Sequence, residues 1–446
     1  MKKLNTLLLF LLLLGASCVK QTKEDGNTAL NNFVTIQNGA LVLNGSPYYF
    51  MGANYWYGMN IGMEKEGNRQ RLINELDQMK AMGITNLRIL ASSEGDENQA
   101  FQVHPTMQSA PGKYNEEVFE GLDFLLTEMR KREMKAVMVL NNFWTWSGGM
   151  PQYLQWAGKG EVPYPQISKE WEKFTDFTTQ FYSNEEANKM FEAHLEVLIG
   201  RTNSISGVQY KEDPTIMSWQ LSNEPRGYKK VNEYRQWIKR TAKYIKTLDT
   251  NHLVSLGSEG DSPGPNAGIN LLGDNDISEI DYLTVHIWAQ NWRWYNPDEP
   301  ENTIEDTKLK VKKYLDKHIK DAQRLGKPAV LEEFGIARDN NDYSPKATTI
   351  WRDKYYQYVF DLVYQYAKKE APIFGMNFWA YSGEGRPTRP KEYWQKGDDF
   401  IGDPPHEPQG WYGVYDKDKS TQEVIKEYAK KMNSLTTIQV AETIER

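Results

Sequence analysis

Eight short runs rich in apolar and aromatic residues recur along the chain, separated by stretches with helical periodicity. Several runs open with near-continuous apolar residues, as strands do when both faces of a parallel sheet are covered. The runs lie at 48–56, 86–90, 135–143, 216–224, 252–260, 282–288, 328–335 and 373–381. A closed (β/α)8 barrel needs eight strands with intervening helices, so the pattern predicts an α/β fold, a single TIM-barrel domain.

The segments between the runs support this prediction. Apolar residues recur there at helical spacing. Examples are Val118, Leu122, Leu125 and Met129, and later Val311, Leu315, Ile319 and Ala322. Gly83 and Gly326 each precede a run, where a glycine commonly ends a helix. The alternative is an open doubly wound sheet, but no glycine-rich phosphate-binding fingerprint follows the first run. Long insertions rich in Trp and Pro at 144–170, 289–306 and 382–412 are expected to shape a cleft.

The first residues are typical of an export signal. Lys2 and Lys3 precede an apolar stretch at 7–14, and small residues then lead to Cys18, which is the only cysteine. This placement resembles a bacterial lipoprotein processing site, with Cys18 as the lipidation candidate; the alternative is an ordinary signal peptide with an incidental cysteine. We expect a membrane-anchored lipoprotein at the outer membrane or cell surface, or otherwise a secreted protein.

These observations divide the chain into four parts. We expect a signal peptide at 1–17, a flexible polar tether at 18–35, the barrel domain at 36–436 and a C-terminal tail at 437–446. No linker long enough to separate two domains follows residue 33. The formal net charge is −7 and the basic residues are scattered, which argues against a nucleic-acid partner. We expect a monomer whose only membrane contact is the lipid anchor.

Polar and aromatic side chains gather where the predicted strands end. In a parallel barrel, catalytic side chains lie at the C-terminal ends of the strands. These ends carry Trp56, Arg88, Asn141, Asn142, Asn223, Glu224, Glu259, His286, Trp288, Glu333 and Trp379. Glu224 and Glu333 each follow a strongly apolar strand and can face one another across the barrel mouth. Hydrolysis of a glycosidic bond needs one carboxylic acid and one carboxylate, so these two residues are the candidate catalytic pair.

The motifs around these residues resemble glycoside hydrolase family 5. SNEP at 222–225 and EEFG at 332–335 are similar to the acid/base and nucleophile signatures of that family, whose catalytic glutamates end strands four and seven. SWQLSNEPR, LEEFG, QSAPGKYNE (108–116), NNFW (141–144) and HIWAQNWRW (286–294) resemble its endo-β-1,4-mannanase branch more closely. The resemblance covers about residues 36–430, which is nearly all of the expected mature chain.

The resemblance implies a role for each matching position. Glu224 corresponds to the acid/base and Glu333 to the nucleophile. Asn223 corresponds to the residue that binds the sugar 2-hydroxyl, and Arg88 to the one that steadies the nucleophile. His286 is expected to hold the active-site hydrogen-bond network, and Trp379 to lie under the sugar that is cleaved. Trp56, Trp144, Trp288 and Trp292 are further candidates for substrate binding.

Two departures from the family pattern stand out. Asn141 and Asn142 occupy the end of strand three, where many relatives have histidine, and Trp288 replaces a tyrosine that commonly binds the nucleophile. We therefore expect Glu333 to rely on other donors. Glu332 competes with Glu333 for the nucleophile role, but alternation along a strand places neighbouring side chains on opposite faces, which favours Glu333.

The sequence leaves the roles of some residues open. Aromatic residues make up 13% of the chain, with 14 Trp and 26 Tyr, which fits either a large core or sugar binding. Glu259 is expected to serve either structure or substrate binding. The six histidines show no metal-ligand spacing, so we expect no catalytic metal and no cofactor.

The expected activity is retaining endo-β-1,4-mannanase action on mannan, glucomannan or galactomannan. The alternatives are an exo-acting β-mannosidase, an endo-β-1,4-glucanase, and a non-catalytic glycan-binding lipoprotein. The choice between endo and exo action depends on whether the insertions at 144–170 and 382–412 leave the cleft open.

Overall fold

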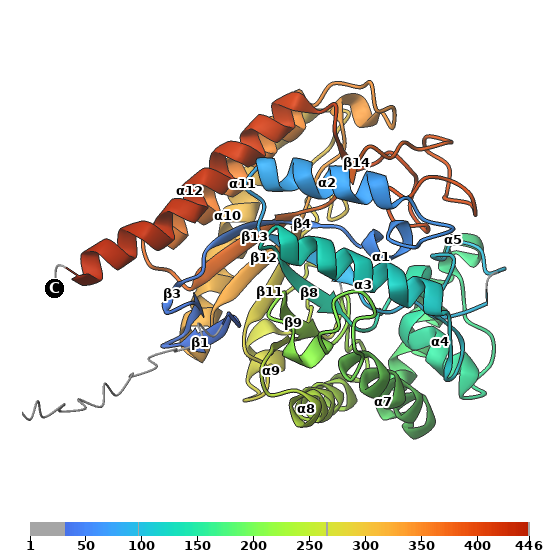
Figure 1. Ribbon diagram of the computed structural model, residues 1–446. Helices are drawn as coiled ribbons and strands as arrows, with labels where there is room; N and C mark the ends of the chain where they lie inside the picture. Colours follow the sequence, from blue (N-terminus) through green and yellow to red (C-terminus); the bar gives the residue numbers. More distant parts are fainter. Residues whose placement is uncertain (1–31, 97, 265, 445–446) are drawn as a thin grey trace, which may run out of the picture. The chain divides into compact units, whose positions relative to one another are not determined.

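A sheet of eight parallel strands forms the centre of the protein (Figure 1). The computed structural model describes residues 32–96, 98–264 and 266–444. The eight strands are β4 (Phe50–Asn54), β5 (Asn86–Leu90), β8 (Lys135–Val139), β9 (Ile216–Gln220), β10 (Leu253–Ser255), β11 (Leu283–Ile287), β12 (Ala329–Phe334) and β13 (Ile373–Phe378). Their order in the sheet is β10-β9-β8-β5-β4-β13-β12-β11. A parallel bridge between Ser255 and Tyr282 joins the two ends, so the predicted barrel is confirmed.

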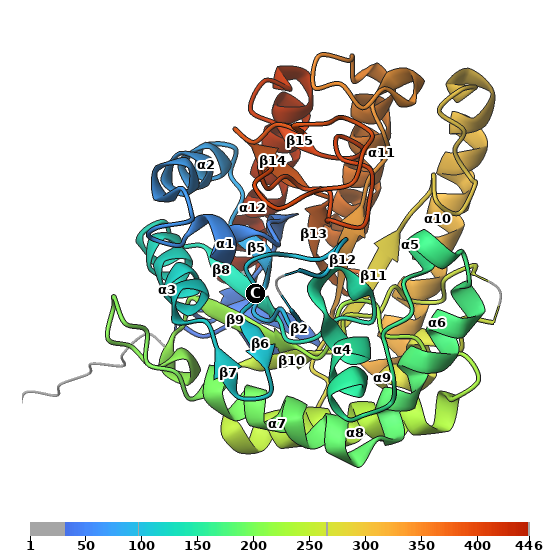
Figure 2. The same ribbon diagram turned by 90° about the vertical axis from the view of Figure 1, so that its right-hand side faces the viewer.

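Helices surround the barrel (Figure 2). The main ones are α2 (Arg69–Ala81), α3 (Glu116–Lys131), α7 (Glu185–Ile199), α8 (Val231–Leu248), α10 (Pro300–Leu325), α11 (Ile350–Lys368) and α12 (Lys419–Ile444), with the shorter α1 (Gly58–Ile61) and α9 (Leu271–Asn275) between them. The long helices from α2 to α11 each lie between two consecutive barrel strands, and they bury one apolar face, as the spacing of apolar residues predicts. Helix α2 ends shortly before Gly83 and α10 ends directly before Gly326, in agreement with the sequence.

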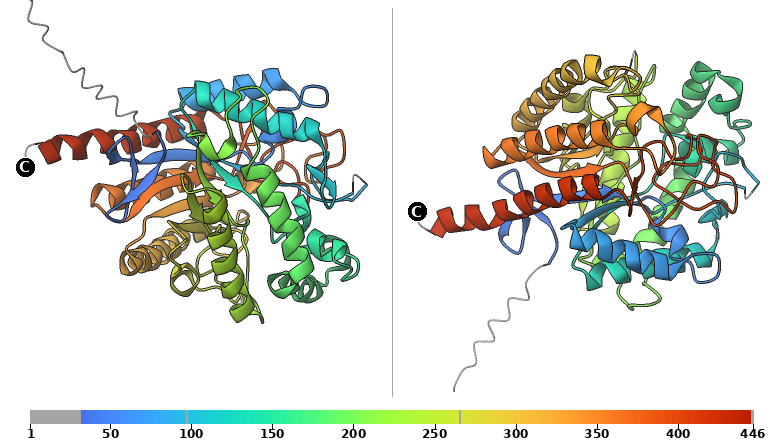
Figure 3. Two further views of the ribbon diagram at one scale, coloured as in Figure 1. Left: turned by 60° about the horizontal axis from the view of Figure 1, so that its bottom comes forward. Right: turned by 90° about the horizontal axis from the view of Figure 1, so that it is seen from above.

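The C-terminal helix completes this outer layer. In Figure 3, α12 lies between α11 and α2. The side chain of Asn433 on α12 donates to the carbonyl oxygen of Gly83 at 3.3 Å, and Thr436 donates to the carbonyl oxygen of Pro47 at 2.9 Å. The helix continues to Ile444, past the expected domain boundary at residue 436. No helix-stopping residue occurs at that boundary.

A small antiparallel sheet precedes the barrel. It consists of β1 (Thr35–Gln37), β2 (Ala40–Leu43) and β3 (Ser46–Pro47). Val34 is buried in the core, so the packed domain begins slightly before the expected boundary at residue 36. The expected signal peptide and Cys18 lie outside the described residues. Within the described residues, we find no helix that combines the length and apolar character needed to cross a bilayer.

Two of the three long insertions meet above the C-terminal ends of the strands. The first forms the 3-10 turn η1 (Thr145–Ser147), α4 (Gly149–Trp156) and α5 (Pro165–Ser168), and α6 (Trp171–Thr178) follows it. The second extends between β14 (Tyr381–Gly383) and β15 (Val414–Tyr415). Gln166 and His406 contact one another across the two insertions, with Nε2 and Nδ1 3.4 Å apart. The indole of Trp56 also donates to the carbonyl oxygen of Gly402 at 2.9 Å, which fixes the second insertion to the end of β4.

Candidate active site

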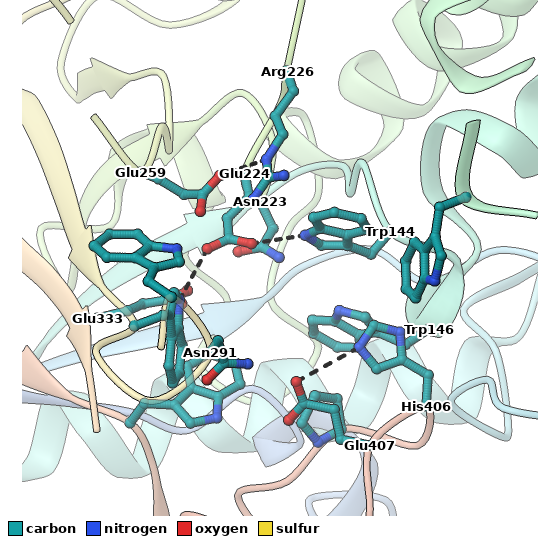
Figure 4. A pocket seen from close by; sticks show the side chains of 15 residues that line it. Trp144, Trp146, Asn223, Glu224, Arg226, Glu259, Asn291, Glu333, His406 and Glu407 are labelled. Atoms are coloured by element: carbon teal, nitrogen blue, oxygen red, sulfur yellow. Dashed lines mark hydrogen bonds and ion pairs between the residues drawn. The ribbon is translucent and has the colours of Figure 1, made fainter. Parts of the chain in front are cut away.

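A pocket of about 260 Å³ opens at the C-terminal ends of the strands (Figure 4). Strand ends form its floor and the insertions form its walls, so side chains far apart in sequence meet here. The lining residues are Trp144, Trp146, Trp171, Asn223, Glu224, Arg226, Glu259, Trp288, Asn291, Trp292, Glu333, Trp379, Pro404, His406 and Glu407. The pocket therefore brings together both candidate glutamates and four of the predicted tryptophans.

Glu224 lies just beyond the end of β9 in an unusual backbone conformation. Its φ is 47°, in the left-handed region that side chains other than glycine rarely adopt. The Glu224 amide donates to the carbonyl oxygen of Gly257 at 2.9 Å, which holds this conformation. A side chain at Gly257 would place a Cβ 1.9 Å from the carbonyl oxygen of Ser222, so only glycine permits this close approach. Such strain costs about 1–3 kcal/mol and is typical of functional positions.

Three donors hold the Glu224 carboxylate. Oε1 accepts from His286 Nδ1 at 2.8 Å and from the Trp288 indole at 3.2 Å, and Oε2 accepts from the Trp144 indole at 2.7 Å. Trp288, which replaces the family's tyrosine, thus contacts Glu224 and not Glu333. Because both oxygens are occupied by donors, the carboxylate is fixed in one orientation toward the pocket.

Glu333 lies on β12 at the floor of the pocket and is almost fully buried. Arg88 donates to its Oε1, and His286 Nδ1 lies 3.3 Å from its Oε2. These two cationic groups provide the donors that the missing tyrosine would otherwise supply. The geometry therefore fits the expectation that Glu333 relies on donors other than Trp288.

The side chains of β12 do not alternate between the two faces of the sheet at Glu332, contrary to the prediction from sequence. Leu331 pairs with Val285, but Glu333 pairs with His286, so a β-bulge leaves Glu332 without a partner residue on β11. The Glu332 side chain is consequently buried beneath Glu333. It accepts from Gln220 Nε2 at 2.9 Å and forms an ion pair with Arg88 Nε at 3.3 Å. Glu333 lines the pocket and Glu332 does not, which leaves Glu333 as the carboxylate that can reach a substrate.

Arg88 connects the residues beneath the pocket. Besides Glu333, it donates to Gln220 Oε1 at 2.7 Å and to Asn223 Oδ1 at 2.8 Å. Asn223 in turn donates from Nδ2 to Asn142 Oδ1 at 3.2 Å. Asn142 therefore fixes the orientation of the Asn223 amide at the pocket surface.

Glu224, His286 and Glu333 influence one another's pKa values strongly. Burial alone would raise the pKa of Glu224, but its hydrogen bond to His286 and the charge of that ring lower it to about 2. Burial alone would lower the pKa of His286, but the charge of Glu333, the hydrogen bond to Glu224 and the ion pair with Glu332 raise it to about 10. Burial raises the pKa of Glu333 to about 7, although His286 and Arg88 oppose this rise. At neutral pH the ring is therefore protonated and Glu224 is ionised.

The spacing of these groups determines which chemistry they can perform. A carboxylate oxygen of Glu224, a ring nitrogen of His286 and a carboxylate oxygen of Glu333 all lie within 4.8 Å of one another. Two carboxyl groups about 5–5.5 Å apart leave no room for a water molecule between them and the sugar, which is the arrangement of retaining glycosidases. The same three atoms could also hold a metal ion. The sequence predicts that these three residues gather at the strand ends, and the structure brings their side-chain atoms together.

The predicted aromatic residues occupy different places around the pocket. Trp144, Trp288, Trp292 and Trp379 line it. Trp379 and Trp288 meet at the floor with ring centroids 5.6 Å apart and planes at 78°. Trp56 does not line this pocket; it packs edge-on against Trp146, and its indole donates to the carbonyl oxygen of Gly402. It lines a small neighbouring pocket that shares Asn223 and Trp379 with the main one.

Several of the lining residues are not among the site residues predicted from the sequence. These are Trp146, Trp171, Arg226, Asn291, Pro404, His406 and Glu407. His406 and Glu407 face Glu224 from the opposite side of the pocket (Figure 4), and both belong to the insertion that was expected to shape a cleft. Glu259 lines the pocket and forms an ion pair with Arg226 at 2.6 Å. The guanidinium of Arg226 lies over the Trp144 ring at 4.9 Å.

Comparison with known proteins identifies relatives of this chain. Residues 31–437 match the glycoside hydrolase family 5 β-mannosidase-like family. Mannan endo-1,4-beta-mannosidase 4 from Solanum lycopersicum is 31% identical over 366 residues, which cover 80% of this chain and 84% of the relative. The family 5 mannosidase from Rhizomucor miehei is 40% identical with a TM-score of 0.84, covering 91% of this chain and 99% of that one.

A more distant structure points to the same family. The endo-β-1,4-mannanase from Thermotoga petrophila has a TM-score of 0.66 at 27% identity and covers 88% of this chain and 78% of that one. A variant of the Rhizomucor miehei enzyme has been solved in complex with mannosyl-fructose. The family match spans far more than half of the residues, and it agrees with the barrel and with the paired glutamates just after β9 and on β12. This chain therefore belongs to glycoside hydrolase family 5.

Proposed function

We propose that this glycoside hydrolase is a retaining endo-β-1,4-mannanase that cleaves internal bonds of mannan, glucomannan or galactomannan. The observation that carries the proposal is the close approach of the Glu224 and Glu333 carboxylates, within 4.8 Å, in a pocket lined by tryptophan. Relatives named mannan endo-1,4-beta-mannosidase support the choice of substrate. Indole rings suit the flat faces of a β-1,4-linked chain, and the amide of Asn223 can bind a sugar hydroxyl.

The reaction proceeds in two steps. In the first, Glu333 attacks the anomeric carbon while Glu224 donates a proton to the departing glycosidic oxygen, which leaves a covalent glycosyl–enzyme ester. In the second, Glu224 takes a proton from water as that water attacks the same carbon, and Glu333 leaves. Two inversions at one carbon preserve the β configuration. The cycle returns one proton to the pair formed by Glu224 and His286, so the pair has the same number of protons at the end as at the start.

His286 is positioned to provide the proton for the first step. Ionised Glu224 beside protonated His286 has the same number of protons as neutral Glu224 beside neutral His286. The two states differ by transfer of one proton across the 2.8 Å hydrogen bond between Nδ1 and Oε1. Loss of positive charge from the ring does not leave Glu333 unsupported, because Arg88 still donates to it.

This arrangement predicts the pH dependence of kcat/KM. Activity should fall as the pH drops below about 7, because Glu333 becomes protonated and loses its nucleophilic charge. It should fall again as the pH rises above about 10, because the proton shared by His286 and Glu224 is lost. In His286→Asn the basic limb should move to lower pH and the acidic limb to higher pH, since Glu333 also loses a neighbouring cation.

The measurement is the pH profile of kcat/KM on a manno-oligosaccharide for the wild type and for His286→Asn. Circular dichroism at each pH serves as the control for folding. A variant profile of unchanged width would show that His286 does not govern the proton on Glu224.

The substrate assignment is tested by comparing matched oligosaccharides. Mannose differs from glucose in its axial 2-hydroxyl, so discrimination depends on polar groups such as Asn223 rather than on stacking. A buried polar group left unpaired by the wrong epimer costs about 1–3 kcal/mol. We expect kcat/KM on manno-oligosaccharides to exceed that on the matching cello-oligosaccharides by at least about tenfold. Equal or faster hydrolysis of cello-oligosaccharides would indicate an endo-β-1,4-glucanase.

A second candidate is an exo-acting β-mannosidase, and one observation favours it. The contact between Gln166 and His406 joins the two insertions beside the pocket, and the indole of Trp56 fixes the second of them. Such a joined wall restricts the passage of a long chain. Early products from mannohexaose distinguish the candidates: an endo-acting enzyme releases oligosaccharides first, whereas an exo-acting enzyme releases only mannose from the earliest time point.

For the location of the protein, we propose that Cys18 carries a lipid anchor after export. The apolar stretch and the small residues before Cys18 support this proposal. Cys18→Ala should move the protein from the membrane fraction to the soluble fraction, because each buried methylene of the anchor contributes about 0.8 kcal/mol to membrane affinity. A wild-type protein that is wholly soluble and carries no lipid by mass spectrometry would contradict the anchor.

A further inference from the structure

Trp171, the first residue of α6, is exposed in a way that large aromatic residues seldom are. Its relative exposure is 51%, although it lines the catalytic pocket. Among the exposed large apolar side chains of the described residues, Trp171 alone belongs to that pocket. An exposed apolar surface at the mouth of a binding pocket commonly marks a place where a ligand is bound.

The position of Trp171 relative to Glu224 indicates which part of a ligand it would meet. Trp144 lies beside Glu224, on the side away from Glu333 (Figure 4), and its indole donates to Glu224 Oε2 at 2.7 Å. Since Glu224 donates its proton to the departing oxygen, Trp144 lies on the leaving-group side of the scissile bond. The Trp171 ring adjoins Trp144, with centroids 6.5 Å apart and planes at 79°.

The helix that carries Trp171 is firmly held. Phe174, one turn further along α6, is buried and stacks on Trp144, with centroids 5.9 Å apart and planes at 16°. Lys229, which follows Glu224 in sequence by five residues, forms ion pairs with Glu172 at 2.8 Å and with Asp176 at 3.0 Å. The buried stacking supplies most of the stabilisation, since exposed ion pairs contribute little. Trp171 is therefore a preorganised surface, and binding to it costs little ordering of the protein.

We infer that Trp171 forms a binding subsite for a sugar ring on the leaving-group side of the scissile bond, beyond the ring that contacts Trp144. The inference rests on the proposed function, which places the acid at Glu224. The ligand is a pyranose ring of a β-1,4-linked chain, whose flat C–H face packs on the indole. Since an aromatic face does not read hydroxyl orientation, this subsite contributes affinity for chain length and little selectivity for mannose.

The test compares substrates of two lengths. Mannobiose has one ring on each side of the scissile bond, whereas mannohexaose extends further on the leaving-group side. In Trp171→Ala, the ratio of kcat/KM for mannohexaose to kcat/KM for mannobiose should fall about tenfold, which corresponds to about 1.4 kcal/mol. Trp171→Phe should keep most of the ratio, because it retains a flat ring. A wild-type ratio in Trp171→Ala would overturn the inference.

Ile167→Ala provides a matched control. Ile167 lies on the neighbouring helix α5, is 67% exposed and does not line the pocket, so its replacement should leave the ratio unchanged. Failure of the proposed function would appear in the substrate preference of the wild type and not in the effect of Trp171→Ala. If the wild type prefers cello-oligosaccharides, mannan is the wrong substrate, but the ratio of cellohexaose to cellobiose still tests the subsite in the same variants.

Discussion

Glu333→Ala is expected to lower turnover of mannan by several orders of magnitude while the protein remains folded. The substitution removes the atom that attacks the anomeric carbon, and no other carboxylate in the pocket lies at that position. Arg88 keeps its ion pair with Glu332, so the buried guanidinium is not left without a counter-charge. The measurement is kcat on mannan or mannohexaose, with thermal unfolding followed by circular dichroism as the control for folding.

Azide should partly restore activity in Glu333→Ala. The substitution leaves space on the floor of the pocket, and a small anion there can attack an activated aryl β-mannoside and yield the α-mannosyl azide. Glu332→Ala is the matched control. Loss of Glu332 removes hydrogen bonds from Gln220 and an ion pair from Arg88, so activity should decline, but azide should not rescue it. Rescue of Glu332→Ala, with near-normal activity in Glu333→Ala, would reverse the assignment of the nucleophile.

Glu224→Gln is expected to produce a loss that depends on the leaving group. Hydrolysis of mannan should fall by about 10²–10⁴-fold, because glutamine cannot donate the proton that the departing sugar oxygen needs. An aryl mannoside with an activated leaving group needs no such proton, so its first step should remain fast. The second step should be slow, because no base activates the water. A burst of released phenol followed by slow turnover should therefore be seen in stopped-flow measurements.

The same variant also tests where the proton resides. With an activated substrate, the basic limb of the pH profile should disappear in Glu224→Gln, because proton donation no longer limits the first step. His286→Asn serves as the comparison, since it changes the position of the limb but leaves the acid in place. An unchanged basic limb in Glu224→Gln would assign the acid to another residue. Besides Glu224 and Glu333, the glutamates that line the pocket are Glu259 and Glu407.

The barrel and the strand-end residues could be predicted because each depends on local sequence. Every one of the eight runs contains a strand, and apolar periodicity marks the helices between them. Glu224 and Glu333 could be predicted as the catalytic pair because each follows an apolar strand and belongs to a recognisable motif. Alternation along β12 failed at Glu332, because the β-bulge depends on pairing with β11, which is distant in sequence. Strand register is a property of the assembled sheet, so one strand alone does not reveal it.

The walls of the pocket could be predicted only as a general location. The insertion at 382–412 was expected to shape a cleft, but nothing local marks His406 and Glu407 as the residues that face Glu224. Their place depends on the contact between His406 and Gln166 and on the bond from Trp56 to Gly402. Trp56 shows the converse: it has the position of a substrate-binding residue at a strand end, yet it supports a loop.

The β-bulge at Glu332 also affects the electrostatic potential at the reaction centre. The charge of Arg88 and the contact with His286 outweigh burial and lower the pKa of Glu332, so this carboxylate remains ionised at neutral pH. It takes no part in bond making. As the glycosidic bond breaks, positive charge develops on the anomeric carbon and ring oxygen. The fixed negative charge of Glu332 offsets the charges of Arg88 and His286 beneath the floor, so these cations oppose the developing charge less. The β-bulge thus places a negative charge beneath the floor that favours an oxocarbenium-like transition state.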